Sequence, residues 1–181
     1  WAETFGTDIV VSNCSNNYGP YQYPEKLIPV VIHRALAEDA IPVYGKGDNV
    51  RDWLFVDDHA TALLAVMSRG KSGRTYNIGG DSERTNLEVV ETICRVLDDI
   101  SPREAGVYAD LIEFVQDRPG HDFRYAINAA RIKAELGWHP QVMFENGIRR
   151  TIEWYLYNQG WVDTVGGAAA TKTRLGLGGS E

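Results

Sequence analysis

The chain has 181 residues, enough for one domain with a sizeable hydrophobic core. A hydrophobic content of 44% and a charged content of 24% are ordinary for a soluble globular protein. The formal net charge of -7 argues against a nucleic-acid-binding protein, so any phosphate recognition has to come from a few placed arginines.

Two cysteines, Cys14 and Cys94, are too few for a disulfide framework, and their spacing does not predict a metal site. No apolar run approaches the roughly 20 residues that span a bilayer, and no signal peptide opens the sequence. We therefore expect a soluble protein of the cytoplasm, with no metal, membrane or nucleic-acid partner.

The N-terminal sequence predicts the last turn of a helix, a stop at Gly6 and a strand over 9–11. A row of small polar or polarisable residues follows, from Asn13 to Asn17, which is more than a surface turn requires. A sequence that begins inside the end of a helix is typical of one part of a longer protein.

Apolar spacing then predicts a helix near 27–38, where Pro29 is tolerated because it lies in the first turn. Two extended segments are expected on either side of the turn at 45–47. The next helix is predicted to begin with Asp57 or Asp58 as its cap and to end at Gly70.

The segment 74–80 predicts a strand followed by a turn, and a helix follows with a capping box of Thr85 and Glu88. A short helix is expected between Asn128 and Gly137, and residues 146–158 predict a last amphipathic helix. Residues 164–181 show no periodicity, and we expect them to form a flexible tail.

Strands and helices alternate along the sequence, which favours an α/β fold. The strong parallel strands are too few for a complete doubly wound sheet. We therefore interpret residues 1–20 as the end of one layered system and residues 21–163 mainly as a smaller mixed domain.

Two arginines on separate segments could clamp a diphosphate. Arg51 stands with Asp52 at the start of an apolar strand, and Arg118 lies in a loop where proline fixes the backbone and glycine permits close approach. Arginine binds phosphate oxygens bidentately. The alternatives are a surface ion pair of Arg51 with Asp52, and a pairing of Arg118 with Asp117 or Asp122.

Three other candidates have structural alternatives. Tyr44 could stack on a base, although an aromatic residue in a strand is usually part of the core. Cys14 is interpreted as a small buried residue because no cationic partner adjoins it. His121 and Asp122 look like a catalytic dyad, but neighbouring residues in an extended loop point apart.

A complete catalytic set is missing from the sequence. No G-x-G-x-x-G run stands between a strand and a helix, and none of the nine tyrosines has a lysine four residues later. The residues by themselves predict a polar site for a phosphorylated small molecule.

Several segments in a fixed order resemble one family. NCSNNYGPYQYPEKLIP, PVYGKGDNVRDWLFVDDHA, TYNIGG, DRPGHDFRYAI and GIRRTIEWY are together similar to the dTDP-glucose 4,6-dehydratases, extended short-chain dehydrogenases that act on nucleotide sugars. The resemblance covers about residues 1–163. The first and fourth of these segments narrow it to the 4,6-dehydratases.

The resemblance implies the C-terminal half of such an enzyme, with the last strands of a Rossmann-type sheet and a small mixed α/β substrate-binding domain. Residues 1–20 would be the remnant of the NAD-binding Rossmann domain. The Tyr-x-x-x-Lys and Asp-Glu pairs that transfer protons would be absent, and NAD would be bound mainly by the other half. The family dehydrates dTDP-glucose to dTDP-4-keto-6-deoxyglucose in deoxysugar biosynthesis, and the parent enzyme would be a homodimer.

The resemblance also implies site residues. Cys14 and Asn17 would face the nicotinamide of NAD, and Asn17 also the sugar. The other substrate-binding residues would be Glu25, Lys26 and Leu27 along the substrate, Pro42 and Tyr44 around the thymine, Arg51, Asn86 and Arg118 at the diphosphate, and His121 near the ribose or phosphate. No residue of this chain would be catalytic, and the chain alone is predicted to be inactive.

Two alternatives stay open. The parent could be another NAD-dependent nucleotide-sugar epimerase, dehydratase or decarboxylase, because the elimination catalysts lie outside these residues. The chain could also be a catalytically inert nucleotide-sugar-binding module.

Overall fold

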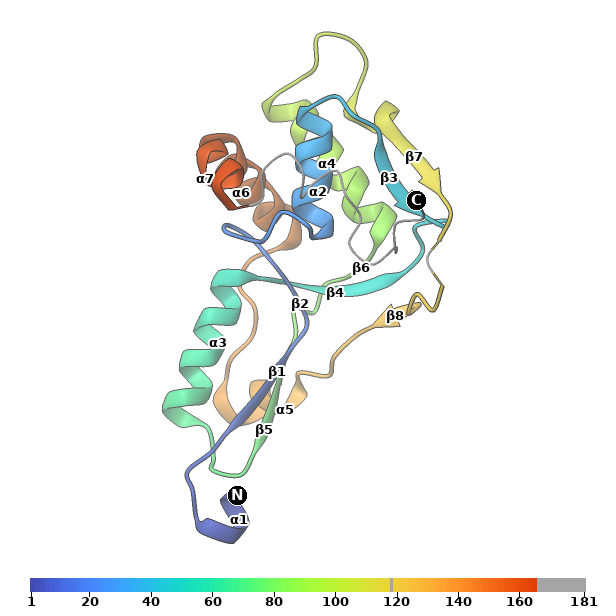
Figure 1. Ribbon diagram of the computed structural model, residues 1–181. Coiled ribbons are helices and arrows are strands. Elements are labelled where there is room, and N and C mark those ends of the chain that lie inside the picture. Colours follow the sequence, from blue (N-terminus) through green and yellow to red (C-terminus); the bar gives the residue numbers. More distant parts are fainter. Residues whose placement is uncertain (118, 166–181) are drawn as a thin grey trace.

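The computed structural model describes residues 1–117 and 119–165, which form an elongated α/β structure (Figure 1). The helices are α1 (Ala2–Phe5), α2 (Leu27–Leu36), α3 (Val56–Arg69), α4 (Asn86–Ile100), α5 (Ala130–Leu136), α6 (Phe144–Tyr157) and α7 (Gln159–Val165), with a short 3-10 helix η1 (Tyr108–Leu111).

Strand β4 (Val50–Phe55) is the centre of the sheet arrangement. It pairs in parallel with β2 (Asn16–Tyr18) and β8 (Arg124–Tyr125), and antiparallel with β6 (Glu83–Thr85). Two further parallel pairs are β1 (Val11–Cys14) with β5 (Thr75–Ile78), and β3 (Ile41–Tyr44) with β7 (Ile112–Val115). These parallel and mixed pairings, together with the helices, confirm the predicted α/β class.

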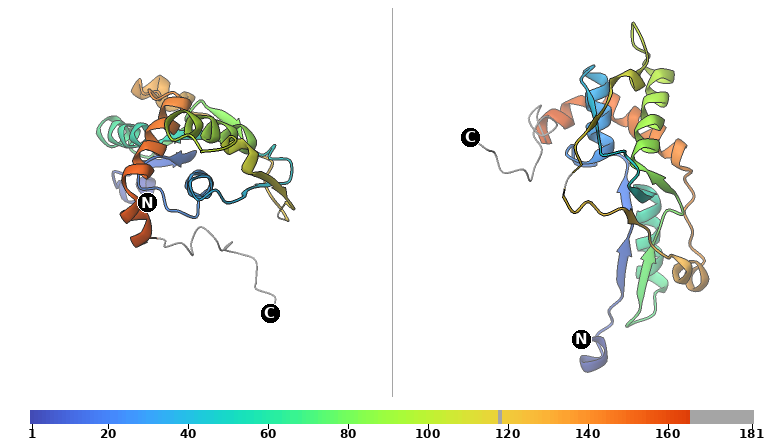
Figure 2. Two further views of the ribbon diagram at one scale, coloured as in Figure 1. Left: turned by 90° about the horizontal axis from the view of Figure 1, so that it is seen from above. Right: turned by 90° about the vertical axis from the view of Figure 1, so that its right-hand side faces the viewer.

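The two outer strand pairs lie at opposite ends of the molecule. Strands β1 and β5 run toward the end that carries the N-terminus, with α1 at its tip, whereas β3 and β7 lie at the other end beside α2 and α4 (Figures 1 and 2). Strand β4 crosses between them, and it therefore connects segments from both ends.

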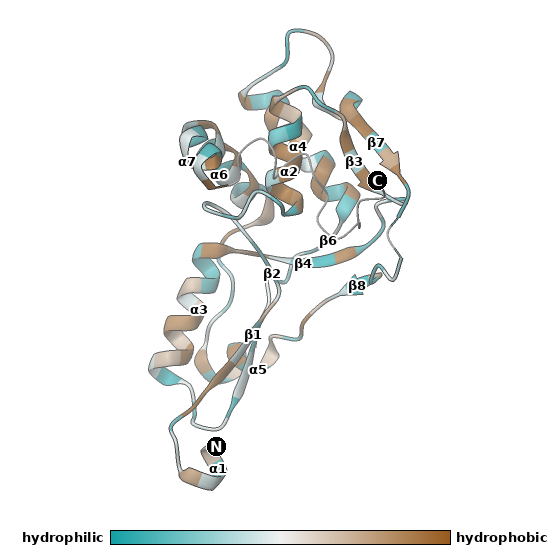
Figure 3. Cartoon of the chain, viewed as in Figure 1, coloured by the Kyte–Doolittle hydropathy of each residue, from teal (hydrophilic) through white to brown (hydrophobic). Residues whose placement is uncertain are grey.

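Two hydrophobic cores stabilise these ends. The larger core lies between α2, α4 and α6, where Ile32, Ile93 and Ile152 are fully buried, and β3 contributes its apolar residues to it (Figure 3). The smaller core contains Ile78 of β5 and Ile132 of α5, packed with residues of α3. Both cores combine segments distant in sequence, and the division at residue 20 stays a prediction.

Most of the predicted elements are confirmed. Helix α2 begins at Leu27, and strands β3 and β4 flank the turn at 45–47. The capping box of α4 is present, because Thr85 Oγ1 accepts the Glu88 amide at 3.1 Å and the Glu88 carboxylate accepts the Thr85 amide at 2.7 Å. Gly6 and Gly137 adopt the left-handed conformation that ends α1 and α5.

The predicted N-terminal strand is wrong in its bounds. Strand β1 begins at Val11 and includes Asn13 and Cys14, because these residues continue the parallel pairing with β5. The polar residues therefore belong to the strand instead of following it.

Two helix predictions are also wrong. Asp57 and Asp58 do not cap α3 but lie inside its first turn, and Asp58 accepts the amides of Gln141 and Val142 at 3.0 and 2.9 Å. Helix α6 is not the last, because α7 follows it to Val165. The rest of the predicted tail, 166–181, lies outside the described residues.

Gly147 lies in α6 where the helix meets Tyr18. A Cβ atom added there would lie 2.2 Å from the Tyr18 hydroxyl and 2.9 Å from its Cζ atom. We predict that Gly147→Ala lowers the free energy of unfolding by about 1–3 kcal/mol, because overpacking outweighs the better helix propensity of alanine. Urea unfolding followed by circular dichroism measures the change.

Gly160 in α7 is the matched control, because nothing lies within 4 Å of its ideal Cβ position. Gly160→Ala should leave stability unchanged or raise it by up to about 1 kcal/mol. Two variants of equal stability would contradict a tight contact between α6 and Tyr18.

Candidate functional site

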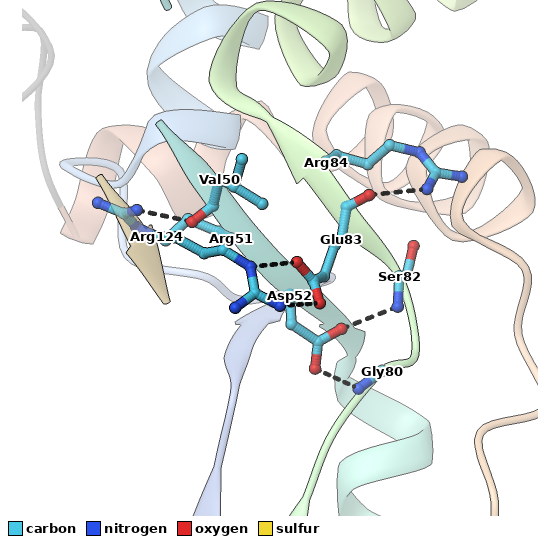
Figure 4. A network of polar contacts seen from close by, with 8 residues as sticks. All are labelled: Val50, Arg51, Asp52, Gly80, Ser82, Glu83, Arg84 and Arg124. Atoms are coloured by element: carbon cyan, nitrogen blue, oxygen red, sulfur yellow. Dashed lines mark hydrogen bonds and ion pairs between the residues drawn. The ribbon is translucent and has the colours of Figure 1, made fainter. Parts of the chain in front are cut away.

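Asp52 connects the central strand to the loop after β5. Asp52 is 3% exposed, and its carboxylate accepts the backbone amides of Gly80 and Ser82, each at 2.8 Å (Figure 4). Gly80 permits this approach, since an added Cβ would lie 2.0 Å from the Trp53 carbonyl oxygen. The alternative of a surface ion pair with Arg51 is therefore wrong, because both side chains are buried and bind backbone groups.

Arg51 holds the segment 120–125. Its Nη2 donates to the Asp122 carbonyl at 2.8 Å, and its Nη1 donates to the carbonyls of Val50 and Phe123 at 2.7 and 3.4 Å. The guanidinium lies 5.1 Å from the centroid of the Tyr125 ring, in a cation–π contact. These contacts place an arginine cation beside the loop that was predicted to bind phosphate.

An ion pair ties the two neighbours of β4 together. Arg124 of β8 donates to both oxygens of Glu83 of β6, at 2.8 and 2.7 Å (Figure 4). This hydrogen-bonded pair holds the pKa of the Glu83 carboxyl below its ordinary value. Because both side chains are exposed, the pair fixes geometry more than it adds stability.

Asn49, just before β4, forms hydrogen bonds with two predicted site segments, the one around Asp122 and the one at Asn86. Its Nδ2 donates to the Asp122 carbonyl at 3.3 Å, and its own carbonyl accepts the Asn86 amide at 3.0 Å. The Asn49 Oδ1 is buried and has no hydrogen-bond partner among the described groups. Asn86 therefore lies beside the same turn that leads into Arg51.

The turn after β3 completes this group. Pro42 and Tyr44 are half-buried on the opposite side of β3 from the buried Ile41 and Val43, so Tyr44 is not the core residue of the alternative reading. The Gly45 amide donates to the Val115 carbonyl at 2.9 Å, which keeps the turn against the end of β7.

His121 contacts Asp117 instead of Asp122. Its Nδ1 lies 2.8 Å from Asp117 Oδ1, and only 6% of the imidazole side chain is exposed. The acidic partner of His121 is therefore Asp117, and not the neighbouring Asp122. Arg118, the remaining predicted phosphate ligand, lies outside the described residues.

A second group of predicted site residues lies at the end of β1. Asn17 Nδ2 donates to Cys14 Sγ at 3.3 Å and to the Ser15 carbonyl at 3.1 Å, while the Asn17 Oδ1 is buried without a partner among the described groups. Cys14 is exposed, so the prediction of a buried thiol is wrong, because nothing in the described chain covers the faces of β1.

The start of α2 follows this second group. Lys26 and Glu25 form an ion pair at 2.7 Å, with the lysine side chain 58% exposed. Leu27, the first residue of α2, packs against the larger core. Because Leu27 anchors the start of α2 on the core, the preceding Glu25–Lys26 pair has a fixed position at the surface.

Strand β4 relates the two groups in space. Asn17 pairs with Leu54 in the β2–β4 ladder, and Arg51 lies three residues earlier on β4. Three residues of a strand span about 10 Å. This ladder fixes the separation of the two groups along β4, and the alternation of side chains turns Asn17 and Arg51 toward opposite faces of the strand.

Two cavities of about 360 and 380 Å³ lie elsewhere, beside α5. They share Asn128 and Ala130 in their linings and include none of the predicted site residues. In the described part of the chain, no group of three or more histidine, cysteine or acidic residues could hold a metal ion. No helix among the described residues is long and apolar enough to cross a membrane.

Sequence reasoning missed Asn49 and the function of Asp52. The signal for Asp52 was the Gly79-Gly80 pair after a strand, which indicates close approach of another backbone. Asn49 stands two residues before Arg51, and no pattern in the sequence indicates that its side chain is buried.

The fold is that of part of an extended short-chain dehydrogenase. The family model described as GDP-mannose 4,6 dehydratase matches residues 1–151, and the chain belongs to that family. A dTDP-glucose 4,6-dehydratase of Escherichia coli is 59% identical over 165 residues, which are 91% of this chain and 45% of the relative.

Two solved structures are similar as well. The dTDP-glucose 4,6-dehydratase from Bacillus anthracis in complex with NAD has a TM-score of 0.80 and 46% identity, over 91% of this chain and 50% of the other. The enzyme of the same name from Streptomyces venezuelae, with NAD and TYD bound, has a TM-score of 0.80 and 40% identity, over 91% and 48%. The chain spans about half the length of the curated relatives it matches, which agrees with the expectation of a C-terminal half.

The Asp52 carboxylate gives the sharpest stability prediction of the site. Asp52→Ala leaves the amides of Gly80 and Ser82 buried without an acceptor, so the free energy of unfolding should fall by about 2–4 kcal/mol. Urea unfolding measures this loss, with Asp48→Ala, an exposed acid four residues earlier in the chain, as the control. Similar stability of the two variants would contradict the assigned hydrogen bonds.

Proposed function

We propose that this chain supplies the nucleotide-sugar-binding part of an NAD-dependent dTDP-glucose 4,6-dehydratase. The observation that carries the proposal is the alignment of two polar groups along β4, in a chain 59% identical over 165 residues to a dTDP-glucose 4,6-dehydratase. One group would hold the nucleotide and diphosphate, and the other the sugar.

At the nucleotide end, Pro42 and Tyr44 would enclose the thymine. Arg51, Asn86 and Arg118 would bind the diphosphate, with His121 near the ribose or phosphate. Hydrogen bonds support this role for Arg51 and Asn86. Arg51 and the Asn49 side chain both donate to the Asp122 carbonyl, and the Asn86 amide donates to the Asn49 carbonyl, so Arg51 and Asn86 lie beside one turn.

At the sugar end, Asn17 would bind the sugar, and Glu25, Lys26 and Leu27 would line the substrate. Cys14 and Asn17 would also contact the nicotinamide of NAD, for which they fit. Cys14 is exposed at the carboxyl end of β1, where ligands bind in open α/β sheets, and the unpartnered Asn17 Oδ1 can accept from an amide or hydroxyl. NAD, when bound, supplies the oxidation at C4 and the later reduction at C6 of the sugar.

This chain would contribute binding and orientation to that reaction. Contacts to the remote nucleotide hold the sugar in one place, and such remote binding energy is used for orientation at the reacting carbon. The ordered β4 ladder keeps the two ends at a constant separation.

Exposed apolar side chains support the proposal that another part of the enzyme covers this one. On β1 and α3, Val11 is 48% exposed, Leu64 59% and Met67 74%. Such exposure is typical of a surface that another protein element covers. NAD would be bound mainly by that element, and the complete enzyme would be a homodimer in the cytoplasm.

Other nucleotides remain the main alternative, since the family model is described by a GDP sugar and the curated relatives by a dTDP sugar. Competition among dTDP, UDP and GDP for the chain separates a dTDP-glucose dehydratase from UDP-sugar epimerases or decarboxylases and from GDP-mannose dehydratases. Tightest binding of GDP or UDP would overturn the proposed substrate.

We predict that the purified 181-residue chain has no dehydratase turnover with NAD and dTDP-glucose, although it binds dTDP. The reason is the absence of a glycine-rich loop and of a Tyr-x-x-x-Lys pair from its sequence. Mass spectrometry of the sugar product tests this, and a 4-keto-6-deoxy sugar formed in proportion to the purified chain would refute the prediction.

Arg118→Ala should weaken dTDP binding about 10- to 100-fold, because one charge-assisted hydrogen-bonding group is lost. Arg124→Ala is the matched control, since it removes a nearby arginine of β8 that is already bound to Glu83. Calorimetric titration compares the two variants. An equal effect of both would mean that only the local positive charge matters.

A further inference from the structure

Gln22 connects the second site group to the helical end of the molecule. It lies in the loop between β2 and α2, and its Nε2 donates to the Asn17 carbonyl at 2.8 Å. The Gln22 carbonyl in turn accepts the hydroxyl of Tyr155, a fully buried residue of α6. One residue thus joins Asn17 to the larger core.

The loop around Gln22 is anchored on both sides. Tyr21 has a φ of 61°, a conformation that a bulky residue rarely adopts, and its ring lies 4.6 Å from that of Trp154 and 5.5 Å from that of Trp161. Tyr18 donates its hydroxyl to the Phe144 carbonyl at 3.3 Å. These contacts with α6 and α7 hold the backbone at Gln22 in a single place.

The consequence falls on the Asn17 side chain. Its amide nitrogen is used by Cys14 and Ser15, so its buried Oδ1 is the atom left to accept from a ligand. The direction of that oxygen depends on the position of the Asn17 backbone. The backbone carbonyl of Asn17 accepts a hydrogen bond from the Gln22 side-chain amide. A side-chain donor is required at Gln22, because a carbonyl oxygen can only accept.

We propose that Gln22 is a positioning residue that directs Asn17 Oδ1 toward the sugar part of the ligand. This inference rests on the proposed function, since it takes a nucleotide sugar as the ligand. Gln22 itself would touch neither the sugar nor the nucleotide, so its substitution should affect sugar recognition and leave nucleotide recognition intact.

The test compares dTDP with dTDP-glucose on the complete 181-residue chain. Titrations followed by tryptophan fluorescence give the preference for dTDP-glucose over dTDP. In Gln22→Leu this preference should fall about tenfold, with dTDP affinity unchanged, because one hydrogen bond that orients the sugar ligand is lost. An unchanged preference, or an equal loss for both ligands, would overturn the proposal.

Two variants complete the ligand experiment. Gln141→Leu is the matched control, because its amide donates to the His139 carbonyl far from the site, and its preference should equal that of the original chain. In Gln22→Glu the preference should be low at about pH 8 and recover as the pH falls toward about 4, near the ordinary pKa of a glutamate, where the protonated carboxyl can donate again. A loss independent of pH would indicate packing instead of a hydrogen bond.

A measurement without ligand separates failure of this inference from failure of the proposed function. In ¹H–¹⁵N spectra, the Asn17 side-chain amide signal, identified by its loss in Asn17→Asp, should shift in Gln22→Leu and stay in place in Gln141→Leu. An unshifted signal overturns the coupling even where dTDP binds. A chain that binds no dTDP refutes the proposed function, and one that binds dTDP and dTDP-glucose equally refutes the assignment of Asn17 to the sugar.

Discussion

The arrangement of the molecule depends on backbone hydrogen bonds to two neighbouring buried side chains of β4. Asp52 accepts amides from the loop after β5, and Arg51 donates to carbonyls of the segment 120–125. A buried backbone group without a partner costs about 1–3 kcal/mol, so each loop has to take the position that these side chains impose. Since Arg51 and Asp52 are adjacent, the two loops are brought to one strand from opposite sides.

A different set of contacts holds the second site group in place, although β1 is exposed. The smaller core contains no residue of β2, the strand that carries Asn17, so it does not orient that side chain. The larger core orients it instead, through Tyr155, Gln22 and the ring of Tyr21, which packs at an angle on Trp154. The left-handed backbone of Tyr21 is tolerated because its ring packs against Trp154 and Trp161.

Local patterns predicted the helices and the capping box of Thr85, because their determinants lie within a few residues of one another. The partners of Asp52 and Arg51 could not be predicted in this way, as they are 28 and 71 residues distant in sequence. The prediction that Cys14 is buried failed for another reason. Burial depends on which elements cover a strand and not on the residue type. The motifs predict which segments form the site, whereas the geometry of those segments is set by nonlocal hydrogen bonds.

The unpartnered atoms suggest how the proposed ligand divides between the two groups. The oxygens Asn17 Oδ1 and Asn49 Oδ1 are buried acceptors, and they can be satisfied only by a hydroxyl or an N–H group. A diphosphate offers acceptors alone, so it requires cationic donors such as arginine. A ligand that satisfies both needs must carry donors separated from phosphate oxygens. A nucleotide sugar has that composition, because its hydroxyl and N–H groups donate hydrogen bonds and its diphosphate oxygens accept them.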